Sequence, residues 1–345
     1  MIKEMIVKAA EGQNLTYDEA YGVIDEIMSG NTSTAQTGAF LTALHIKGET
    51  SEEISGAAAA MRDKALAVSH KSPVLEIVGT GGDKAQSMNV STTTAFLCAA
   101  AGLKIAKHGN RAATSKSGTA DALEAMGGNL MTEPAVVEKL IEEVGFGFMF
   151  AQKFHSAMKY VGPVRREVGI PTIFNILGPL TNPAKPDYFL LGVYKEELVD
   201  LIAETLKKLG AKRAMVVFGQ DVLDEISVSA KTTVAELKED GTIERYEIDP
   251  KDFGIDNSTY TRESICGGEP LHNVNLSKEI LSGRAGTEGS PANTAMRDVV
   301  LLNAAAAIHL YKNIPMKEAF EVAKETMNSG KALQVIEKYV AISNE

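Results

Sequence analysis

The stretch Val74-Leu75-Glu76-Ile77-Val78-Gly79-Thr80-Gly81-Gly82-Asp83 decides the fold class. Its first five residues are mostly apolar, as in a buried strand, and they run directly into three glycines within four positions. Glycine lets backbone amides approach a ligand closely and reach positive φ. The stretch therefore predicts a buried strand that ends in a glycine-rich turn.

Strands and helices alternate after this turn. The apolar patterns predict further strands at 103–106, 146–150, 188–193 and 214–218, and helices at about 91–101, 117–126, 134–144 and 195–209. Such alternation predicts crossover units and a mostly parallel sheet. From about Thr233 to Ile248 the period becomes two, and Glu239-Asp240-Gly241 predicts a hairpin turn. The tail from about Pro291 is expected to be helical again.

The residues before the strand show helical patterns only. Thr16 with Glu19 three residues later is a capping-box pattern at a helix start. Further helices are expected from about Ser33 to Ile46 and from Ser51 toward Val68. We therefore expect an α/β protein with a small all-helical domain over residues 1–72 and a large α/β domain over residues 73–345. The Pro- and Gly-rich segment 162–186 is expected to cross between them.

Composition excludes several classes of protein. The 345 residues carry 45 acids and 35 bases, a net charge of -10, which argues against a nucleic-acid partner. The two cysteines, Cys98 and Cys266, form neither a disulfide framework nor a metal-type spacing. No stretch has about 18 uninterrupted apolar residues and the N-terminus lacks a signal-peptide core, so we expect a cytoplasmic protein with no membrane partner.

The glycine turn is followed by a second phosphate-binding feature. Asn89-Val90-Ser91-Thr92-Thr93-Thr94-Ala95 opens an apolar helix, and a helix start with free amides and hydroxyls binds anions. Together the two features predict a phosphate or pyrophosphate site. Neither the Gly-x-Gly-x-x-Gly signature, whose last position is Lys84 here, nor a P-loop is present. An ordinary turn before a capped helix remains the alternative.

Residues 107–119, Lys-His-Gly-Asn-Arg-Ala-Ala-Thr-Ser-Lys-Ser-Gly-Thr, form a second candidate site. They follow the strand predicted at 103–106, and the ends of parallel strands are the usual ligand edge of a sheet. Three cations, four hydroxyls, two glycines and an asparagine in thirteen residues favour an oxyanion-binding loop. The alternative is a solvated charged loop.

Two charged pairs complete the set of candidates. Asp224-Glu225 follows the strand at 214–218, and adjacent carboxylates at a strand end suit Mg²⁺, which takes few protein oxygens and keeps its waters. In Arg165-Arg166, one guanidinium could hold a substrate carboxylate. Each pair could instead be an ordinary solvated surface. The six histidines form no catalytic set.

These motifs together resemble the anthranilate phosphoribosyltransferases of tryptophan synthesis. The resemblance rests on Gly79 to Asp83, Asn89 to Thr92, Lys107 to Arg111, Arg165 with the string Asn175 to Pro183, and Asp224-Glu225. It implies a nucleoside phosphorylase-like fold and a homodimer formed through the helical domain. It also implies that the phosphoribosyl group of 5-phosphoribosyl 1-diphosphate is transferred to anthranilate, the second step of tryptophan synthesis from chorismate.

The resemblance also implies residue roles. Anthranilate would contact Gly79, Asn110 and Arg165, and Mg²⁺ would be held by Ser91, Asp224 and Glu225. The sugar donor would be held by Gly79, Gly82, Asp83, Ser87, Asn89, Val90, Ser91, Thr92, Lys107, His108, Gly109, Asn110, Arg111, Ala112, Ala113, Thr114, Ser115 and Thr119. No residue is expected to act as a catalytic acid or base, because positioning and electrostatics carry the reaction.

Two other functions fit part of the sequence. A pyrimidine nucleoside phosphorylase would share the sheet, the glycine turn and the helical domain, but the acidic pair and the Asn175–Pro183 string favour the transferase. A non-catalytic relative that binds nucleic acid would be basic and could lack the acidic pair, whereas this chain is acidic and keeps Asp224 and Glu225.

Overall fold

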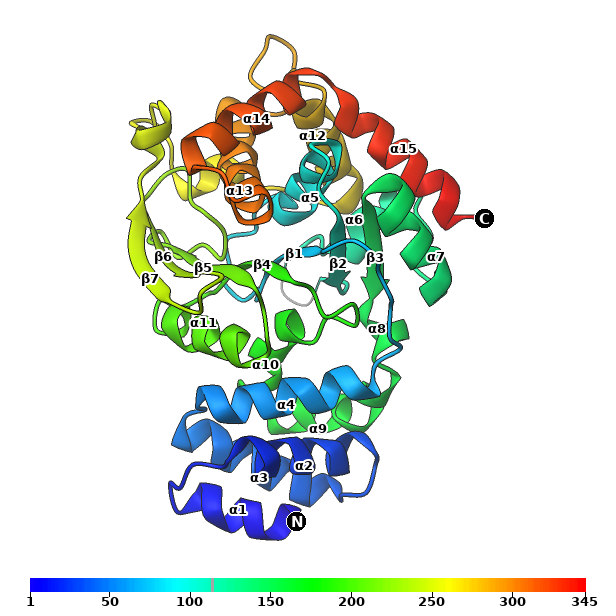
Figure 1. The fold of residues 1–345 in the computed structure, drawn as a ribbon, viewed down its shortest axis with the longest axis vertical. Coiled ribbons are helices and arrows are strands. Elements are labelled where there is room, and N and C mark those ends of the chain that lie inside the picture. The colour runs from blue at the N-terminus through cyan, green and yellow to red at the C-terminus, as the bar shows by residue number, and fades with distance from the viewer. Residues whose placement is uncertain (113–114) are drawn as a thin grey trace.

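The computed structural model describes residues 1–112 and 115–345. Four helices pack together at the N-terminal end, at the bottom of Figure 1: α1 (Ile2–Ala10), α2 (Tyr17–Met28), α3 (Thr34–Lys47) and α4 (Ser51–Lys64). Capping boxes at Thr16, Ser33 and Thr50 start α2, α3 and α4, as a side-chain oxygen accepts a backbone N–H that the helix leaves free. The expected extension of α4 to Val68 is wrong, since the helix ends at Lys64.

A seven-stranded sheet forms the centre of the larger part, with strand order β3-β2-β1-β4-β5-β6-β7. The first five of these are parallel, and β6 and β7 add an antiparallel hairpin to β5. The strands are β1 (Leu75–Gly79), β2 (Ile105–Gly109), β3 (Phe146–Phe150), β4 (Tyr188–Gly192), β5 (Arg213–Gly219), β6 (Thr232–Leu237) and β7 (Ile243–Ile248). The mostly parallel sheet and its hairpin are confirmed.

Strand β2 differs from the expected strand at 103–106. It begins at Ile105 and includes Lys107, His108 and Gly109, so these residues belong to the sheet and not to the loop after it. Lys107 and His108 are 1% and 5% exposed. The apolar pattern ends at Ala106 because buried polar side chains with specific partners continue the strand.

Helices cover both faces of the sheet. On one face lie α5 (Val90–Ala100), α6 (Thr119–Ala125), α7 (Pro134–Lys139) with a π-helical turn (Leu140–Val144), α12 (Pro270–Leu281), α13 (Thr294–Lys312), α14 (Met316–Asn328) and α15 (Lys331–Ser343). The sequence pattern did not predict α12. On the other face α11 (Leu198–Lys208) packs in the same apolar core as the N-terminal helices. Short 3-10 turns lie at Pro250–Phe253 and Arg262–Ile265. No helix in the described ranges is long and apolar enough to cross a membrane.

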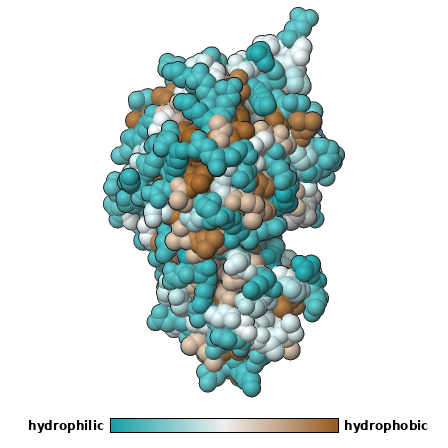
Figure 2. Space-filling model, turned by 90° about the vertical axis from the view of Figure 1, so that its right-hand side faces the viewer, coloured by the Kyte–Doolittle hydropathy of each residue, from teal (hydrophilic) through white to brown (hydrophobic). Residues whose placement is uncertain are grey.

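The segment after β3 runs from the sheet to the N-terminal helices and back. It contains α8 (Ala151–Phe154), a 3-10 turn (Ser156–Tyr160), α9 (Gly162–Val168), α10 (Phe174–Leu177) and a second 3-10 turn (Gly178–Leu180). Helix α9 packs on α3, and the Leu180 carbonyl accepts a 2.7 Å hydrogen bond from Arg62 Nε of α4. In Figure 1, α9 lies at the level of the N-terminal helices, below the sheet. In the side view the molecule narrows between its larger and smaller parts (Figure 2).

The strand order also locates the ligand edge of the sheet. The chain proceeds from β1 to β2 and β3 on one side and then returns to place β4 on the other side of β1. In open α/β sheets, ligands bind outside the carboxyl ends of the strands at such a reversal. The reversal lies between β1 and β4, which end at Gly79 and Gly192.

Candidate active site

The acidic pair lies directly over the ends of β1 and β4. The Thr80 N–H donates to the Gly192 carbonyl (2.9 Å), which holds the glycine turn against β4. The Gly81 N–H donates to Asp224 Oδ2 (2.7 Å). A β-carbon on Gly79 would lie 2.2 Å from Asp224 Oδ2, so the acidic loop approaches this closely only because a glycine ends the strand.

Three carboxylates gather beside the turn. Asp224 and Glu225 are buried, at 9% and 8% exposed, whereas Asp83 is half-buried and one of its oxygens is enclosed with no hydrogen-bond partner among the described residues. Burial raises the pKa of Asp224 well above its ordinary value, and the charges of Asp83 and Glu225 raise it further. Burial also raises the pKa of Glu225 to about 8, although Lys107 opposes this shift. Negative charge is therefore poorly compensated here, and a bound cation would stabilise it.

This donor set fits Mg²⁺. Among the residues that the structure describes, no three His, Cys, Asp or Glu side chains converge as a complete protein metal site. Mg²⁺ usually binds through one or two carboxylates and takes its other oxygens from water and substrate phosphates. Two or three carboxylate and hydroxyl oxygens beside a glycine turn that can bind phosphate match this mode of Mg²⁺ binding.

Lys107 and Ser91 connect the acidic pair to helix α5. Lys107 Nζ donates to the Ile77 carbonyl (2.5 Å) and to Ser91 Oγ (3.3 Å). Burial lowers the pKa of Lys107, whereas the carboxylates of Glu76, Glu225 and Asp224 raise it. The N–H of Ser91 lowers the pKa of Glu225 by hydrogen bonding. The lysine, the first turn of α5 and the acidic pair therefore form one cluster, at a helix end that favours anions.

The rest of the glycine turn and the start of α5 are fixed by buried hydrogen bonds. Gly82 has a φ of +86°, and the loop reaches Ser87, which forms a β-bridge with Cys266. Asn89 precedes Val90, the first residue of α5, and its side chain does not cap the helix. Instead Asn89 Nδ2 donates to the Ser117 carbonyl (3.1 Å) and its Oδ1 accepts from Asn273 (3.0 Å). The backbone amides of the first turn of α5 therefore receive no side-chain cap from Asn89.

Two sequence-predicted segments meet at the end of β2. Thr92 Oγ1 donates to Thr119 Oγ1 (3.3 Å), and a β-carbon on Gly109 would lie 3.1 Å from Thr119 Cβ. The structure therefore brings Thr92, Gly109 and Thr119 together, although they come from α5, β2 and α6.

The loop after β2 is organised by Asp121. Its carboxylate accepts from the N–H groups of Ala112 (2.8 Å) and Gly118 (3.0 Å) and from Arg111 (3.0 Å). Arg111 also pairs with Glu124 and is exposed, as are Asn110 and Ser115. Ala113 and Thr114, which we also expected to contact the sugar donor, lie outside the described residues.

Among the described residues, the one hydrogen bond of the Arg165 side chain is to the crossing segment and not to the residues expected to bind phosphate. Arg165 lies on α9, donates to Asn175 Oδ1 (3.3 Å) and stacks over Phe174 at 5.7 Å. Asn175 also accepts the Thr172 N–H (3.0 Å). Burial lowers the pKa of Arg165. Its guanidinium is therefore held by the crossing segment, on the helical side of the molecule.

His108 and His155 form a buried pair below the end of β2. Their rings are 4.9 Å apart and nearly edge to face, and His108 Nδ1 lies 3.3 Å from the Gly178 carbonyl. Burial lowers the pKa of His108 to about 3 and that of His155 to about 4, so both are neutral at pH 7. His108 Nε2 and both nitrogens of His155 have no partner among the described residues.

Sequence patterns missed two residues near these strand ends. Glu76 is fully buried in β1, and Gly192 ends β4 against Asp224. Asn182 belongs to the string Asn175 to Pro183 that the sequence singled out, but no role was assigned to it, and it is fully buried beside Glu76. Glu76 had a readable signal, since it is a lone carboxylate in an apolar strand. Gly192 had a weaker one, because like Gly79 it ends an apolar strand.

Comparisons with known proteins agree with this geometry. Residues 71–333 match the family model described as "Glycosyl transferase family, a/b domain", and residues 3–65 match its helical bundle domain. Anthranilate phosphoribosyltransferases from Lachnoclostridium phytofermentans and Aquifex aeolicus are 47% and 46% identical, each with 100% of this chain and 99% of the relative aligned.

Solved structures give the same result. The crystal structure of the Thermus thermophilus anthranilate phosphoribosyltransferase superposes with a TM-score of 0.91 at 39% identity, covering 99% of both chains. The Saccharomyces cerevisiae enzyme in complex with PRPP and Mg has a TM-score of 0.88 at 29% identity, covering 99% of this chain and 98% of that chain. With full-length relatives at this identity and the whole fold shared, the chain belongs to the anthranilate phosphoribosyltransferase family.

Proposed function

We propose that the crevice over the ends of β1 and β4 binds the diphosphate of the sugar donor together with Mg²⁺. The reaction is transfer of the phosphoribosyl group of 5-phosphoribosyl 1-diphosphate to anthranilate, which gives N-(5-phosphoribosyl)anthranilate and diphosphate in tryptophan synthesis. One observation carries the assignment: the buried carboxylates of Asp224 and Glu225, with the half-buried Asp83 near them, lie beside the glycine turn and the buried Lys107. The yeast relative in complex with PRPP and Mg supports it.

In this proposal Ser91, Asp224 and Glu225 would hold Mg²⁺. The Thr80 and Gly81 amides are already bonded to Gly192 and Asp224, so the phosphate oxygens would be received by the amides after Gly81 in the glycine turn and by the start of α5, where the helix dipole favours anions. The hydroxyls of Thr92 and Thr119 and the loop around Arg111 surround the remaining phosphate. Arg111 would have to exchange part of its pairing with Asp121 and Glu124 for the substrate.

The chemistry follows from where charge develops. As the bond from the sugar C1 to diphosphate breaks, positive charge grows on the sugar ring and negative charge on the leaving group. Mg²⁺, when bound, supplies electrostatic stabilisation of the diphosphate. The buried ammonium of Lys107 adds to it from the protein side. The amine of anthranilate attacks C1 from the opposite face, and because an aromatic amine is neutral at pH 7, no strong general base is needed.

Arg165, Asn110 and Gly79 are assigned to anthranilate. The Arg165 guanidinium would pair with the substrate carboxylate and Asn110 would orient the ring. A yeast relative in complex with 4-fluoroanthranilate supports a site for this substrate class. Arg165 lies on α9, whereas Gly79 and Asn110 lie at the edge of the sheet. The two substrates are therefore brought together across the two parts of the molecule.

We also propose the domain division that this arrangement requires. Residues 1–72 with the crossing segment 162–186 would form one domain, and the rest of residues 73–345 the other. Closure between them would bring Arg165 toward the donor site. Small-angle scattering with and without both substrates should then show a smaller radius of gyration in the ternary complex, and an unchanged radius would count against closure.

The helical part carries a surface suited to a second copy of the chain. A groove of about 630 Å³ lies between α1 and α3 and is lined mainly by apolar residues: Ile6, Ala9, Ala10, Gly12, Gly38, Ala39, Thr42, Ala43, Ile46 and Lys47. Ile46 is 78% exposed and Val7 is 55% exposed. Exposed apolar groups of this kind mark association surfaces. We therefore propose a homodimer through α1 and α3, in the cytoplasm, without a nucleic-acid or membrane partner.

The assignment is tested by following anthranilate fluorescence over time. Loss of fluorescence should require the protein, anthranilate, 5-phosphoribosyl 1-diphosphate and Mg²⁺ together, and omission of any one should stop it. No loss with folded protein, combined with phosphorolysis of thymidine or uridine, would instead assign the crevice to a nucleoside phosphorylase.

A further inference from the structure

Strands β1 and β2 pair only at their beginning. Leu75 is in register with Ile105, and the Leu75 N–H donates to the Lys104 carbonyl (2.9 Å). In a parallel ladder the next bonds would join Ile77 to Ala106 and to His108. In contrast, β1 pairs with β4 over its whole length, from Leu75 to Gly79. The two strands therefore separate toward the carboxyl ends, where the donor site lies.

Three of the four backbone groups that would continue the ladder are bound by side chains. The His108 N–H donates to Glu76 Oε2 (2.9 Å), and the Ala106 carbonyl accepts from Asn182 Nδ2 (2.7 Å). The Ile77 carbonyl accepts from Lys107 Nζ (2.5 Å). Buried backbone groups need partners, so these side chains compensate for the missing ladder bonds.

Glu76 and Asn182 are also bound to each other. Asn182 Nδ2 lies 2.5 Å from Glu76 Oε2, and both side chains are fully buried. Burial raises the pKa of Glu76 to about 7, against the influence of Lys107 and of the N–H donors. Burying the Glu76 carboxylate lowers the stability of the folded protein more than burying an apolar side chain would. The proposed reaction gives Glu76 no part in the chemistry.

Asn182 lies in the segment that returns from the helical part. Two residues earlier, the Leu180 carbonyl accepts from Arg62 Nε of α4 (2.7 Å). A continuous series of buried hydrogen bonds therefore runs from His108 through Glu76 to Asn182, and the bond between Leu180 and Arg62 links the same segment to α4. The crossing segment that presents Arg165 is fixed to the same strand end as Lys107.

We propose that Glu76 and Asn182 are positioning residues that hold the ends of β1 and β2 apart and couple the donor site to the crossing segment. The inference rests on the proposed assignment of that crevice to the sugar donor. When the donor occupies the carboxyl ends of these strands, the Glu76–Asn182 pair links the position of β1 and β2 to the segment that carries Arg165. Neither residue contacts the reacting atoms.

The chain offers a matched control for Glu76. Glu53 is also a fully buried carboxylate that accepts backbone N–H groups, from Leu15 (2.7 Å) and Thr50 (2.8 Å), and it pairs with Lys47 at 2.9 Å. It lies in α4, and its polar partners among the described residues, Leu15, Lys47 and Thr50, all belong to the helical part. Glu53→Leu therefore reports what loss of a buried carboxylate does to folding alone.

The experiment compares hydrogen exchange and kinetics of the full-length protein and its Glu76→Leu, Asn182→Ala and Glu53→Leu variants. Leucine removes both carboxylate oxygens, whereas glutamine would keep an oxygen able to accept from Asn182 and His108 as Glu76 Oε2 does. In the wild type and in Glu53→Leu, 5-phosphoribosyl 1-diphosphate with Mg²⁺ should slow exchange both in residues 79–92 and in residues 170–183. In Glu76→Leu and Asn182→Ala, protection of residues 79–92 should persist while that of residues 170–183 is lost. The kcat of these two variants should fall by about 10- to 100-fold, with the KM for the donor changed much less, because small misplacement lowers turnover.

Other outcomes distinguish the positioning role of Glu76 and Asn182 from the assignment of the crevice to the sugar donor. Full protection of residues 170–183 in folded Glu76→Leu and Asn182→Ala, or kcat within about twofold of Glu53→Leu, would overturn the positioning role. Absence of donor protection at residues 79–92 in the wild type would overturn the donor assignment, and the kcat comparison would still decide the role of the pair. If one variant fails to fold, the other carries the same test, because each removes one partner of the Glu76–Asn182 bond.

Discussion

The backbone of Gly192 lies directly against the backbone of Asp224. A β-carbon on Gly192 would lie 1.6 Å from the Asp224 carbonyl oxygen and 2.2 Å from the carbonyl carbon. Gly192 pairs with Gly79 in the β1–β4 register, so the ends of both strands at the reversal point lack side chains. The loop that carries Asp224 can lie against the sheet here only because Gly79 and Gly192 have no side chains.

Gly192→Ala should therefore displace Asp224 by more than 1 Å. Because displacements of this size are costly at reacting centres, we expect kcat/KM to fall by about 100-fold or more. Steady-state kinetics at saturating Mg²⁺ measures the loss. Gly162→Ala is the control, since its β-carbon would meet only the end of Arg166 at 3.7 Å. Near-normal activity of Gly192→Ala would mean that the position of the Asp224 backbone does not matter.

The acidic pair makes a prediction about Mg²⁺. Asp224→Asn combined with Glu225→Gln should raise the Mg²⁺ concentration for half-maximal turnover by at least about tenfold, as loss of metal-site carboxylates does. The metal-free variant should also be more stable than the metal-free wild type, because two buried, poorly compensated charges are removed. The adjacent, exposed pair Glu196 and Glu197 provides the control double substitution to glutamine. An unchanged Mg²⁺ profile would remove Asp224 and Glu225 from the metal site.

Arg165 makes a prediction about substrate selectivity. Arg165→Ala should raise the KM for anthranilate by about 10- to 100-fold, the usual range for loss of a hydrogen bond to a charged group. The KM for the sugar donor should change much less, because Arg165 contacts only the crossing segment in the described structure. The exposed neighbour Arg166 supplies the control, Arg166→Ala. Equal increases in both KM values would make Arg165 a structural residue.

Local patterns were sufficient for the fold and for much of the candidate site. The glycine turn, the capped start of α2 and the acidic pair are each contained in a few consecutive residues, so the sequence alone predicts them. The bounds of β2 were wrong because Lys107 and His108 interrupt the apolar pattern while their partners, Ile77 and Gly178, are distant in sequence. Burial of these side chains depends on tertiary contacts that no short window contains.

The contact between Gly192 and Asp224 could not be predicted from a short stretch of sequence either. It depends on the register of β1 with β4 and on the loop that follows β5. Val222 in that loop has a φ of +64°, a conformation that sequence does not predict for a β-branched residue. The role of Asn182 was equally hidden, since its partners Glu76 and Ala106 lie 106 and 76 residues away.

The proposed dimer surface is tested by a charge placed in the groove. Ile46→Glu puts a carboxylate where two apolar faces would meet, so the dimer should dissociate to monomers at micromolar concentration because an unpaired charge is costly to bury. Analytical ultracentrifugation measures the change. Leu271→Glu is the control, because Leu271 is a similarly exposed apolar residue, 64% exposed, on α12 of the other part. A dimer that persists in Ile46→Glu but dissociates in Leu271→Glu would move the interface to α12.

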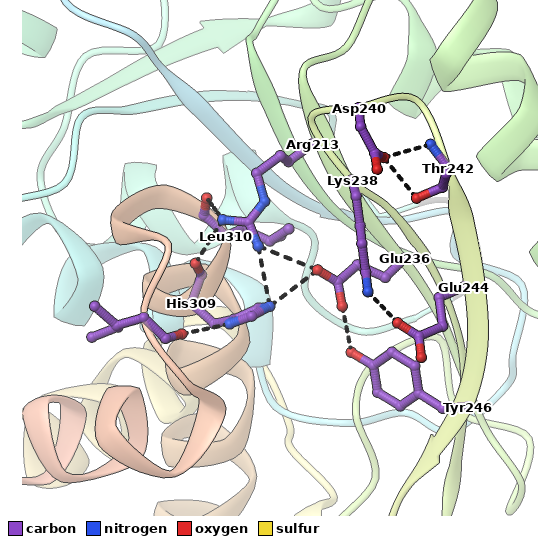
Figure 3. Close-up of polar contacts among 10 residues, drawn as sticks. Arg213, Glu236, Lys238, Asp240, Thr242, Glu244, Tyr246, His309 and Leu310 are labelled. Atoms are coloured by element: carbon purple, nitrogen blue, oxygen red, sulfur yellow. Dashed lines mark hydrogen bonds and ion pairs between the residues drawn. The ribbon is translucent and has the colours of Figure 1, made fainter.

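The last prediction concerns acid stability and a polar cluster at the edge of the sheet (Figure 3). Glu236 of β6 accepts from Tyr246 (2.9 Å) and Arg213 (3.2 Å) and lies 3.1 Å from His309 Nε2, while Arg213 also donates to the Leu310 carbonyl (3.0 Å) near the end of α13. Burial alone would raise the pKa of Glu236, but these partners, His309 first, lower it from 4.5 to about 2. The cluster therefore attaches α13 to the hairpin through an ionised carboxylate.

A carboxyl group whose pKa is lower in the folded state stabilises the protein above its unfolded pKa, and this stabilisation is lost as the pH falls toward the folded value. The contribution of Glu236 should thus be complete above about pH 4.5 and disappear toward pH 2. The full shift corresponds to roughly 3 kcal/mol, and we expect about half of it because solvent screens the cluster. Glu236→Gln should therefore unfold more readily in urea at pH 7, and its difference from the wild type should shrink between pH 4.5 and pH 3. Glu239→Gln, in the exposed turn of the same hairpin, is the control. If the free energy of unfolding depended on pH in the same way in both variants, protonation of Glu236 would not be the cause of the loss of stability in acid.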